Sequence, residues 1–512
     1  MTETSKIFNG ASSIETPKAK AELEREKGNS FFREGGYYQA IEHYSRSVEL
    51  DGSMTLSYLN RALMYLRTEC PGAAIHDTEK ALQLLSLESH EGEAGERLAA
   101  KAYYRQGYAK YVLGHTAEAL ACFKSALRCV PSDAASLKMR KACEKDETRR
   151  KFLLAIASEE VKRPYQFIDW KRVSLPGKTV ETSERSKELW ENPETRSITH
   201  EFIDDMLSKF RNGTPFPARY ATRIFLEARS VFASFPNAVP IDYSKQTRLT
   251  VCGDIHGQFF DLMHLFETNG FPSKENPYLF NGDVVDRGAY GVECLLTLCA
   301  FKILLPNHFF LARGNHEGLN LNKVYGFENE IRTKYSSDMF DLAHDLFRSL
   351  PLCHIIGKTV FVVHGGLFTT DGVKVEDINK VDRSIDIPES GLMCDMLWSD
   401  PQDRPGRREN KRGVGVAFGP DITENFLDTN NFQLLVRSHE VKQDGFEIHH
   451  GGKCITVFSA PNYCGQVGNK AAYLHFTFDD QPGPLSSLAK PKINQFDAAV
   501  CPSQVRSFMD QI

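Results

Sequence analysis

The sequence predicts a chain of two unlike domains, an all-α repeat array followed by an α/β domain. The first domain is indicated by small residues that return every 34 positions in the N-terminal third of the chain. The second is indicated by short apolar runs that end in polar clusters and alternate with stretches of helical periodicity. The length of 512 residues, with 41% apolar and 25% charged residues, gives room for two to four ordinary soluble domains.

Composition and charge exclude several classes of function. The formal net charge of -5 is small for this length, so no global field favours nucleic acid or a membrane as partner. The twelve cysteines have neither a Cys-x-x-Cys pair nor a regular spacing, which predicts free thiols in a reducing compartment, the cytoplasm or the nucleus. Residues 1–20 are polar and are expected to be a mobile tail. Because no long apolar run occurs, we expect neither secretion nor membrane insertion.

Three columns of small residues define the repeat array. They are Ala40, Ala74 and Ala119; Gly28, Ala62 and Gly107; and Ser47, Ala81 and Ala126. In every column the first interval is 34 residues and the second is 45, which is 34 plus an insertion of 11 that maps to residues 87–97. This period is typical of the tetratricopeptide (TPR) repeat, in which two helices approach closely. We predict three repeats and a capping helix over residues 21–157, with a concave surface for a peptide.

Five polar residues are expected to line that concave surface. They are Arg25, Asn29, Asn60, Lys101 and Arg105. Cations and amides that converge from successive repeats hold a carboxylate-rich peptide end by charge-assisted hydrogen bonds. The five positions resemble the carboxylate clamp of chaperone-binding TPR domains, with Arg25 in place of the usual lysine, which alters that contact. The resemblance implies that a heat-shock protein 90 type chaperone binds through its acidic C-terminal tail; the alternative is that these residues are solvated helix surface.

A linker is expected over residues 158–185, where Pro164, Pro176 and Gly177 interrupt the helical pattern. The basic runs at 149–151 and 162–163 are typical of a solvated helix face, in preference to a nuclear-import or acidic-partner site. Helical periodicity returns over residues 182–234, which predicts the first helices of the second domain, packed on its sheet.

Polar clusters follow the apolar runs of the second domain. The first three clusters are residues 253–257, 282–288 and 313–317, each directly after a predicted strand, and a predicted helix follows the first two, as in βαβ units. Later strands lead into His364, His439 and the stretch 459–463 in the same way. Because ligands collect at the carboxyl ends of strands in such architectures, we expect these side chains to meet at one edge.

Six of these side chains form a mixed nitrogen and oxygen set that suits two divalent ions such as Mn, Fe or Zn. They are Asp254, His256, Asp283, Asn315, His364 and His439. Asp283, from the middle strand of the first three, is the best candidate to bridge the two ions. The paired charge would lower the pKa of a bridging water, so that hydroxide is available near pH 7.

Four further residues complete a set for phosphoryl transfer to water. His316 is expected to protonate the leaving oxygen, while Asp286 orients its ring and holds it cationic. Arg287 and Arg412 offer planar forks for the phosphate oxygens. No side-chain nucleophile is needed.

The motifs Gly-Asp-x-His-Gly, Gly-Asp-x-Val-Asp-Arg-Gly, Gly-Asn-His-Glu and His-Gly-Gly, in this order, resemble the metal-dependent serine/threonine phosphoprotein phosphatases. The stretches 398–401, 437–439 and 459–465 extend the match. The resemblance implies a central β-sandwich flanked by helices over residues 186–485, in place of the doubly wound sheet that periodicity alone suggests. It also implies the roles given above for the metal ligands, the acid and the arginines, and places Tyr463 near the phosphate.

In TPR-bearing members of this family, the TPR domain and a C-terminal helix cover the active site until a partner or a lipid displaces them. The resemblance therefore implies autoinhibition, with Glu69 as the candidate to meet the site arginines. The C-terminal segment, residues 486–512, would supply the second part of the lid, with Val505, Phe508 and Met509 on one apolar face. The chain departs from the family pattern at the insertion 87–97, at Gly465 and from Gln481 onward.

The sequence thus predicts a monomeric protein serine/threonine phosphatase, a phosphoric monoester hydrolase that is regulated and targeted by its TPR domain. Two alternatives stay open: a catalytically inactive TPR co-chaperone scaffold, and a metallophosphatase that acts on small phosphate esters. The pair His449 and His450 and the basic stretch 404–412 are expected to be surface, apart from Arg412.

Overall fold

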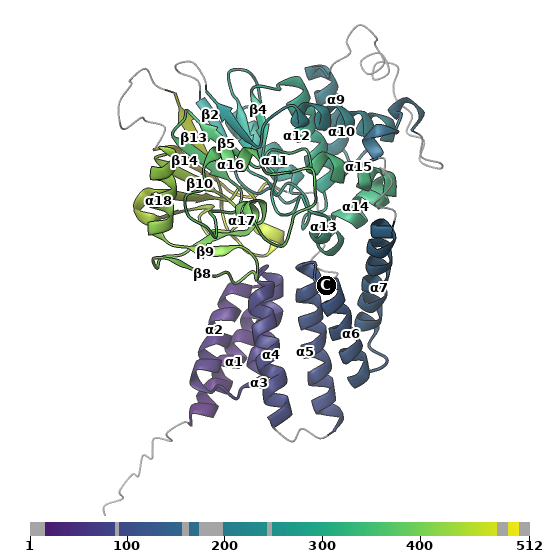
Figure 1. Ribbon diagram of the computed structural model, residues 1–512, viewed down its shortest axis with the longest axis vertical. Helices are drawn as coiled ribbons and strands as arrows, with labels where there is room; N and C mark the ends of the chain where they lie inside the picture. The colour runs from purple at the N-terminus through teal and green to yellow at the C-terminus, as the bar shows by residue number, and fades with distance from the viewer. Residues whose placement is uncertain are drawn as a thin grey trace, which may run out of the picture. The chain divides into compact units, whose positions relative to one another are not determined.

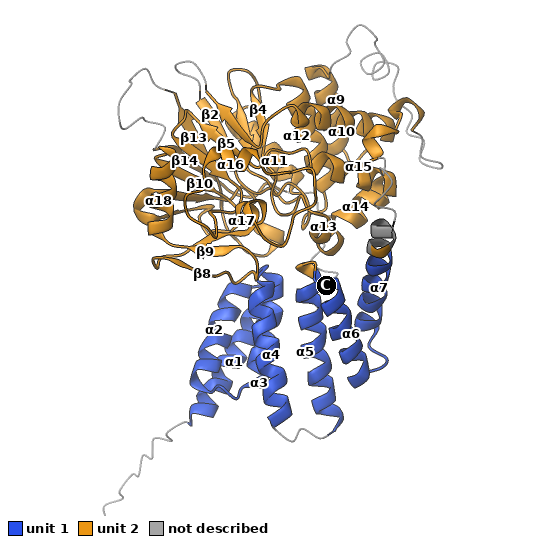
Figure 2. Cartoon of the chain, in the orientation of Figure 1, with its two compact units in different colours: residues 1–111, 115–149 blue, residues 112–114, 150–512 orange. Residues whose placement is uncertain are grey.

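The computed structural model describes residues 16–87, 92–155, 163–173, 198–242, 248–478 and 490–500. The chain divides into two compact units, one formed by residues 1–111 and 115–149 and the other by residues 112–114 and 150–512 (Figure 2). The predicted tail up to residue 15 and the apolar face at Val505, Phe508 and Met509 lie outside the described residues.

The first unit is a stack of antiparallel helix pairs, which confirms the predicted TPR array (Figure 1). Helices α1 and α2, α3 and α4, and α5 and α6 form the three repeats, and α7 follows as the cap. Their bounds are α1 (Pro17–Arg33), α2 (Tyr37–Leu50), α3 (Thr55–Arg67), α4 (Pro71–Leu87), α5 (Glu93–Val112), α6 (Thr116–Cys129) and α7 (Ala134–Ala155).

The small-residue columns lie where the helices of a pair touch. A Cβ atom on Gly28 would stand 2.6 Å from the ring of Tyr44, and one on Gly107 would stand 2.9 Å from the ring of Phe123. The alanines of the other columns are fully buried. The repeat spacing is therefore a packing requirement, because any larger side chain at these positions would push the two helices apart.

The insertion between the second and third repeats goes with longer helices on either side of it. Helix α4 has 17 residues and α5 has 20, against 14 each in α2 and α6. Residues 87–97 include four glutamates, which favour helix, and two glycines, Gly92 and Gly95, which do not. Residues 88–91, at the centre of the insertion, lie outside the described residues.

The second unit is built on two large sheets and one small sheet. The six-stranded sheet has the order β1-β5-β6-β10-β12-β11, the five-stranded sheet has the order β14-β13-β2-β3-β4, and the small one is β7-β9-β8. The bounds are β1 (Ala238–Ile241), β2 (Arg248–Cys252), β3 (Tyr278–Phe280), β4 (Phe309–Leu311), β5 (Cys353–Ile356), β6 (Val360–Val363), β7 (Asp400–Pro401), β8 (Arg407–Glu409), β9 (Val416–Phe418), β10 (Leu434–Arg437), β11 (Phe446–His449), β12 (Cys454–Val457), β13 (Ala471–Thr477) and β14 (Lys492–Phe496).

The two large sheets pack face to face, which confirms the predicted β-sandwich. Each contains three neighbouring parallel strands, β2-β3-β4 in one and β6-β10-β12 in the other. Val251 pairs with Leu279, which pairs with Phe310, and all three join a core cluster that also holds Val362 and Val436 of the other sheet. The strands read as continuous apolar runs because both of their faces are buried.

Helices cover the outer faces of the sandwich. Helices α9 to α12 and α15 pack with the five-stranded sheet, and α18 packs with the six-stranded sheet, where Phe426 contacts Phe361. The bounds are α9 (His200–Arg211), α10 (Ala218–Ala233), α11 (Phe259–Asn269), α12 (Gly291–Leu304), α13 (Leu319–Tyr325), α14 (Phe327–Lys334), α15 (Ser337–Phe347), α16 (Val375–Asn379), α17 (Leu392–Trp398), α18 (Pro420–Asn430), and the short 3₁₀ turns η1 (Pro164–Gln166), η2 (Trp170–Arg172), η3 (His450–Gly452) and η4 (Tyr463–Gly465).

Two segments outside the predicted catalytic domain pack against this unit. Residues 163–173, within the predicted linker, place Tyr165 and Trp170 against its helical core. Strand β14, within the predicted C-terminal segment, pairs with β13 as the edge of the five-stranded sheet. Both belong to the structural body of the second unit.

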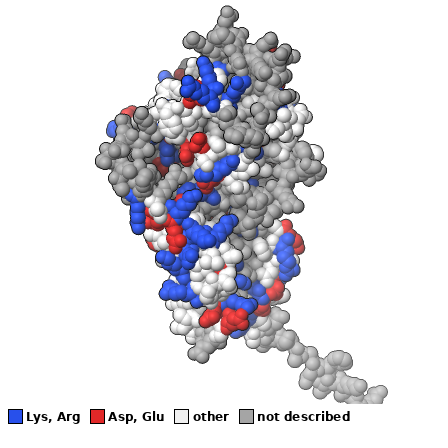
Figure 3. Space-filling view, turned by 90° about the vertical axis from the view of Figure 1, so that its right-hand side faces the viewer, with Lys and Arg blue, Asp and Glu red and all other residues white. Residues whose placement is uncertain are grey.

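Three observations on the described residues concern membrane insertion, the state of the cysteines and the surface charge. No helix among them is both long and apolar enough to cross a membrane. Eleven cysteines in the described ranges are free thiols. On the face shown in Figure 3, basic and acidic side chains lie interspersed.

Candidate active site

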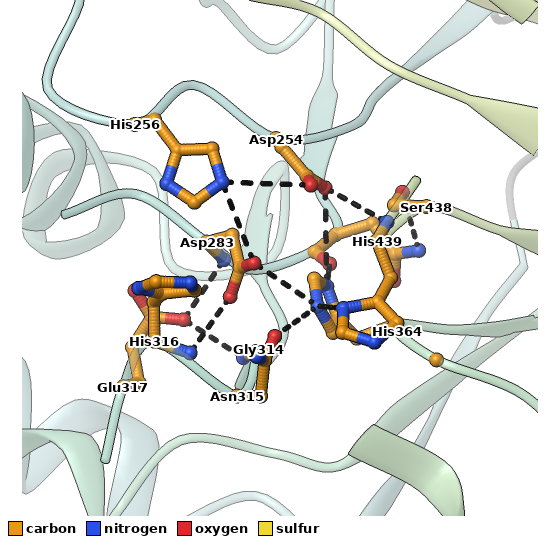
Figure 4. Close-up of polar contacts among 12 residues, drawn as sticks. Asp254, His256, Asp283, Gly314, Asn315, His316, Glu317, His364, Ser438 and His439 are labelled. Carbon is orange, nitrogen blue, oxygen red and sulfur yellow. Dashed lines mark hydrogen bonds and ion pairs between the residues drawn. The ribbon is translucent and has the colours of Figure 1, made fainter. Parts of the chain in front are cut away.

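The candidate metal ligands follow the parallel strands of both sheets. Asp254 and His256 follow β2, Asp283 follows β3, Asn315 follows β4, His364 follows β6 and His439 follows β10. Because the strands of each triplet are parallel, their carboxyl ends open onto one edge of the sandwich. Figure 4 shows that the six side chains point toward one another.

The loops that carry these residues are bent sharply. His256, Asp283, Asp286, Arg287 and His439 all have positive φ, between 48° and 71°. Each such non-glycine residue costs about 1–3 kcal/mol and persists only where the surroundings hold it. Such strained backbone is typical of functional sites.

Backbone hydrogen bonds hold two of these loops together. The amide of His256 donates to the carbonyl of Asp283 at 3.0 Å, and the amide of Gly288 donates to the carbonyl of His256 at 2.9 Å. A Cβ atom on Gly288 would stand 2.4 Å from the same carbonyl oxygen. Glycine is therefore required for the close approach of the loops after β2 and β3.

Asp283 lies between two groups of potential ligands. Its Oδ2 atom is 3.6 Å from Nε2 of His256 and 3.3 Å from Nε2 of His364. It belongs both to the group with His256 and His316 and to the group with His364 and His439, whose ligand atoms lie within 4.8 Å of one another. This position is the one expected of a carboxylate shared by two ions.

Asp254 lies at the edge of both groups. Its Oδ2 atom is 3.7 Å from Nε2 of His256, and its Oδ1 atom is 4.0 Å from Nδ1 of His364 and accepts the backbone N–H of His439 at 3.1 Å. The carboxylate therefore faces the same space as Asp283.

The side-chain oxygen of Asn315 tests whether these residues fit a cation. It points at four electron-rich atoms: Nε2 of His364 at 2.9 Å, Nδ1 of His439 at 3.1 Å, and both carboxylate oxygens of Asp283 at 3.0 and 3.2 Å. Turning the amide over would let its N–H groups donate to them. A cation among these atoms would satisfy the oxygen and the buried carboxylates together, so the donor set fits divalent metal ions.

Burial and nearby charges give the carboxylates of Asp254 and Asp283 different pKa values. Burial, and then the charge of Asp283, raise the pKa of Asp254 to about 7. Burial acts in the same direction on Asp283, but the nearby His364 and His316 outweigh it and hold the pKa of Asp283 below its usual value. Asp283 is therefore the carboxylate that most firmly keeps its negative charge.

Glu317 is a buried carboxylate to which the sequence assigned no role. It accepts the backbone N–H groups of Asp283 and Val284, each at 2.9 Å, and that of Gly314 at 2.8 Å. It thereby joins the loop after β3 to the loop after β4. The signal was present in the sequence, because Glu317 stands in the same polar cluster as Asn315.

His316 and Asp286 form a close buried pair. Nδ1 of His316 lies 2.8 Å from Oδ2 of Asp286, and neither side chain is exposed. The ring of His316 also meets that of His256 edge to face, with centroids 4.8 Å apart. His316 is a member of the first group of potential ligands, and its Nδ1 atom faces Asp286, as an acid would face its orienting carboxylate.

Two arginines and a tyrosine border the ligand groups. The guanidinium of Arg287 stacks 3.9 Å from the ring centroid of Tyr325. Arg412 donates to Asp400 at 2.8 Å and to the carbonyl of His439 at 3.0 Å. The ring of Tyr463 lies 5.1 Å from that of His256.

Asp400 is a second buried carboxylate whose role the sequence did not predict. It accepts from Arg412 and, at 2.7 Å, from Arg437. Burial opposes its charge, but these two arginines outweigh it and lower the pKa of Asp400. A fixed anion at this point holds Arg412 in place.

In the first unit, the structure brings several of the predicted clamp residues together. The side-chain oxygen of Asn29 accepts from Asn60 at 3.0 Å and from the hydroxyl of Tyr44 at 2.8 Å. Arg105 donates to the carbonyl of Leu59, beside Asn60, at 2.6 Å, and burial lowers its pKa to about 10, so that it stays cationic at neutral pH.

The remaining clamp candidates differ in their surroundings. Arg25 is held by Glu22 and Glu26 on its own helix. Lys101 is exposed one turn before Arg105 on α5. Glu69, the candidate inhibitory residue, lies in the turn between α3 and α4 with φ of 58°.

Two family models match the sequence. Residues 247–443 match the model described as calcineurin-like phosphoesterase, and residues 140–240 match the one described as PPP5 TPR repeat region.

Several known proteins resemble the chain. Serine/threonine-protein phosphatase 5 of Homo sapiens is 40% identical over 484 residues, which are 94% of this chain and 92% of the relative. Serine/threonine-protein phosphatase T of Trypanosoma brucei brucei is 44% identical over 464 residues, 90% of this chain and 93% of the relative. A solved Saccharomyces cerevisiae phosphatase, described as similar to human phosphatase PP5, matches with a TM-score of 0.57 and 39% identity over 60% of this chain and 98% of its own.

Proposed function

The chain belongs to the serine/threonine-protein phosphatase 5 family and is a phosphoprotein phosphatase; we propose that its site transfers the phosphoryl group of phosphoserine and phosphothreonine directly to water. The observation that carries this proposal is the position of Asp283, whose Oδ2 atom lies within 3.6 Å of His256 and 3.3 Å of His364. A shared carboxylate between two imidazole groups supports a two-metal hydrolase.

Membership of the metallophosphoesterase family implies divalent metal ions. We propose two, of Mn, Fe or Zn, because the donor set mixes imidazole with oxygen. Asp254, His256 and Asp283 would hold one, and Asp283 would share the second with Asn315, His364 and His439. When bound, such ions supply hydroxide near neutral pH and neutralise phosphate charge.

The protein's own contribution to bond cleavage is a proton for the leaving group. Nδ1 of His316 is held by Asp286 at 2.8 Å, and we propose that the other ring nitrogen gives a proton to the seryl or threonyl oxygen. The buried carboxylate of Asp286 favours the charged imidazolium that this role needs.

Arg287, Arg412 and Tyr463 are proposed to hold the phosphate. The two guanidinium groups are already oriented, one by the ring of Tyr325 and the other by Asp400. Donors fixed before the substrate arrives stabilise the charge of the transition state without a cost of reorganisation.

The TPR unit is proposed to target and inhibit the enzyme. Arg25, Asn29, Asn60, Lys101 and Arg105 would bind the acidic C-terminal tail of a heat-shock protein 90 type chaperone, a proposal supported by the linked positions of Asn29, Asn60 and Arg105. Glu69 is proposed to meet the site arginines in the inhibited state. We further propose a monomer in the cytoplasm and nucleus; sedimentation and fractionation test these two points.

Steady-state kinetics test the proposed chemistry. With added Mn, the protein should hydrolyse a phosphoserine peptide in preference to nucleotides and diphosphates. His316→Asn should lower turnover of the peptide by about 10²–10⁴-fold, while the metal content stays unchanged. Preference for nucleotides would support a small-ester phosphatase, and absence of hydrolysis would support an inactive scaffold.

A further inference from the structure

The loop that carries Asp286 and Arg287 is held by a helical elbow, of which only Tyr325, beside Arg287, has been given a role so far. Both residues have strained left-handed backbone, with φ of 68° and 70°. Helix α13 ends at Gly326, itself at φ 117°, and α14 begins at Phe327. The elbow is therefore the sharp junction between these two short helices.

Two backbone contacts fix the strained pair to the elbow. The amide of Phe327 donates to Oδ1 of Asp286 at 2.9 Å. The amide of Arg287 donates to the carbonyl of Tyr325 at 3.1 Å, and the ring of Tyr325 stacks under the guanidinium of Arg287 and packs 5.3 Å from the ring of His316.

The third contact is made by a side chain. The Nδ2 atom of Asn322, on α13, donates to Oδ2 of Asp286 at 2.8 Å and to the main-chain carbonyl of His316 at 2.7 Å. Asn322 is fully buried. A single NH₂ group thus spans both halves of the acid pair, the carboxylate of one residue and the backbone of the other.

This arrangement constrains the proton that His316 would use. Oδ2 of Asp286 receives Asn322 and faces Nδ1 of His316, while Oδ1 receives Phe327. The carboxylate therefore cannot rotate without losing a buried hydrogen bond. A fixed carboxylate keeps the Nδ1 proton on its own side of the ring and sets the direction of the opposite nitrogen, from which the proton would be delivered.

We infer that Asn322 is a positioning residue, which sets the orientation of the His316 acid through Asp286. The inference rests on the proposed acid role of His316. Asn322 acts through the pair and is placed on no substrate, so its loss should affect proton delivery and leave phosphate binding intact.

A structural role and a positioning role differ in their dependence on the leaving group. A seryl alkoxide leaves poorly and needs the proton, whereas nitrophenolate leaves without it. The test is the ratio of kcat for a phosphoserine peptide to kcat for p-nitrophenyl phosphate. Both values come from the same preparation, so the ratio cancels the fraction of folded, metal-loaded enzyme.

Asn322→Leu keeps the shape of the side chain and removes the donor. We expect the ratio to fall about tenfold or more, with KM for both substrates within about twofold of the starting protein, because only part of the 10²–10⁴-fold effect of an acid is lost. An unchanged ratio, or an equal loss on both substrates, overturns the inference.

Asn322→Asp is the second variant and preserves shape more closely. A protonated carboxyl at this position can donate to Asp286, whereas an ionised one repels it. The ratio should therefore fall as pH rises, beyond any change that the unsubstituted protein shows. A pH-independent ratio equal to that of the unsubstituted protein contradicts the inference even if the leucine variant does not fold.

Two controls separate this inference from the proposed function. His316→Asn should lower the ratio at least as far; if it does not, the acid role fails and the inference with it, whereas a loss there without one at Asn322 overturns the inference alone. Asn269→Leu removes another buried amide, which donates to Thr250 at 2.9 Å and to Tyr278 at 2.6 Å at the far end of α11. It should leave the ratio unchanged, and a fall there would assign the effect to general loosening.

Discussion

At the scale of single residues, Glu317 shows how a side chain that touches no substrate holds a site together. Its carboxylate accepts three backbone N–H groups, two from the loop of Asp283 and one from the loop of Asn315. The two loops must keep this spacing for their ligand atoms to converge. A buried group that orients ligands in this way affects metal affinity about 10–100-fold.

Glu317→Gln should therefore weaken metal binding by roughly 10–100-fold. The amide presents an NH₂ group to backbone donors where the carboxylate presents oxygen, so at least one of the three hydrogen bonds is lost. The measurement is Mn content against free Mn after equilibrium dialysis.

Glu330→Gln is the matched control. Glu330 accepts two backbone N–H groups, of Gly291 and Val292 at the start of α12, and neither of these residues belongs to a polar cluster that carries metal ligands. Its replacement should lower the melting temperature while metal affinity stays unchanged. Equal metal affinity in both variants would contradict the role given to Glu317.

Lys302 is a buried amine whose contribution to the free energy of unfolding depends on pH. Its ammonium donates to the carbonyls of Pro306 at 2.8 Å and Phe309 at 3.0 Å and lies 4.1 Å from the ring centroid of Phe235. Burial nevertheless disfavours the charged form and lowers the pKa of Lys302 to about 7, from an ordinary value near 10.5. Between these two values the unfolded chain binds a proton that the folded chain does not.

Stability should therefore gain from this residue as pH rises. Because the unfolded state binds more protons, the free energy of unfolding increases with pH between about 7 and 10.5, by at most about 1.4 kcal/mol per unit. Lys302→Met lacks this contribution. Melting temperatures of both proteins from pH 7 to 9.5 should show the unsubstituted protein gaining on the variant; parallel curves would refute the low pKa.

At the scale of elements, the parts that the sequence predicted are those with a local signal. The TPR helices follow from small-residue columns, since Gly28 and Gly107 stand where a helix touches its partner. The strands before Asp254, Asp283 and His364 follow from short apolar runs that end in a polar residue. Such patterns depend only on near neighbours in the chain, so they can be recognised without knowledge of the fold.

Parts that depend on which loops meet could not be predicted in this way. Glu317, Asp400 and Asn322 owe their roles to hydrogen bonds with residues from other loops. The strand β14 (Lys492–Phe496) is a half-exposed edge with polar residues, so its sequence lacks the apolar run of a central strand. Residues 492–496 do not alternate strictly between apolar and polar, and hydrogen bonds to partners distant in sequence leave no periodic pattern.

The segment 163–173 packs on α10 through two aromatic side chains. The ring of Tyr165 lies 3.4 Å from the guanidinium of Arg229 on α10, and the ring of Trp170 lies 5.1 Å from that of Arg223 on the same helix. This segment therefore clasps α10 through cation–π contacts and apolar packing. Tyr165→Ala and Trp170→Ala should each destabilise the second unit by about 1–3 kcal/mol.

Differential scanning calorimetry measures the effect of these substitutions. Phe167→Ala is the control within the same segment, because this side chain is 62% exposed and little packing is lost. It should leave the melting temperature nearly unchanged. If Tyr165→Ala and Trp170→Ala melted at the temperature of the unsubstituted protein, these two side chains would contribute nothing to the stability of the unit.

At the scale of the whole molecule, one chain joins a peptide-binding unit to a hydrolytic unit. The clamp candidates Lys101 and Arg105 stand one turn apart on α5, and Arg105 keeps its charge at neutral pH. We propose that the first unit inhibits the second. Hydrolysis should therefore become faster when an acidic peptide occupies the clamp, and also when the first unit is removed.

A protein that begins at residue 150 lacks the first unit and can be compared with the full chain. Hydrolysis of a phosphoserine peptide by the shorter protein should exceed that of the full chain several-fold. A peptide that ends in Glu-Glu-Val-Asp should raise the activity of the full chain and leave that of the shorter protein unchanged. Added salt should weaken this activation, because it depends on charge pairing.

Lys101→Glu should abolish the response to the peptide. The control is Lys124→Glu, at an exposed lysine on α6 outside the clamp, which should preserve the response. Equal basal activities would refute inhibition by the first unit, and activation that survives Lys101→Glu would refute the clamp.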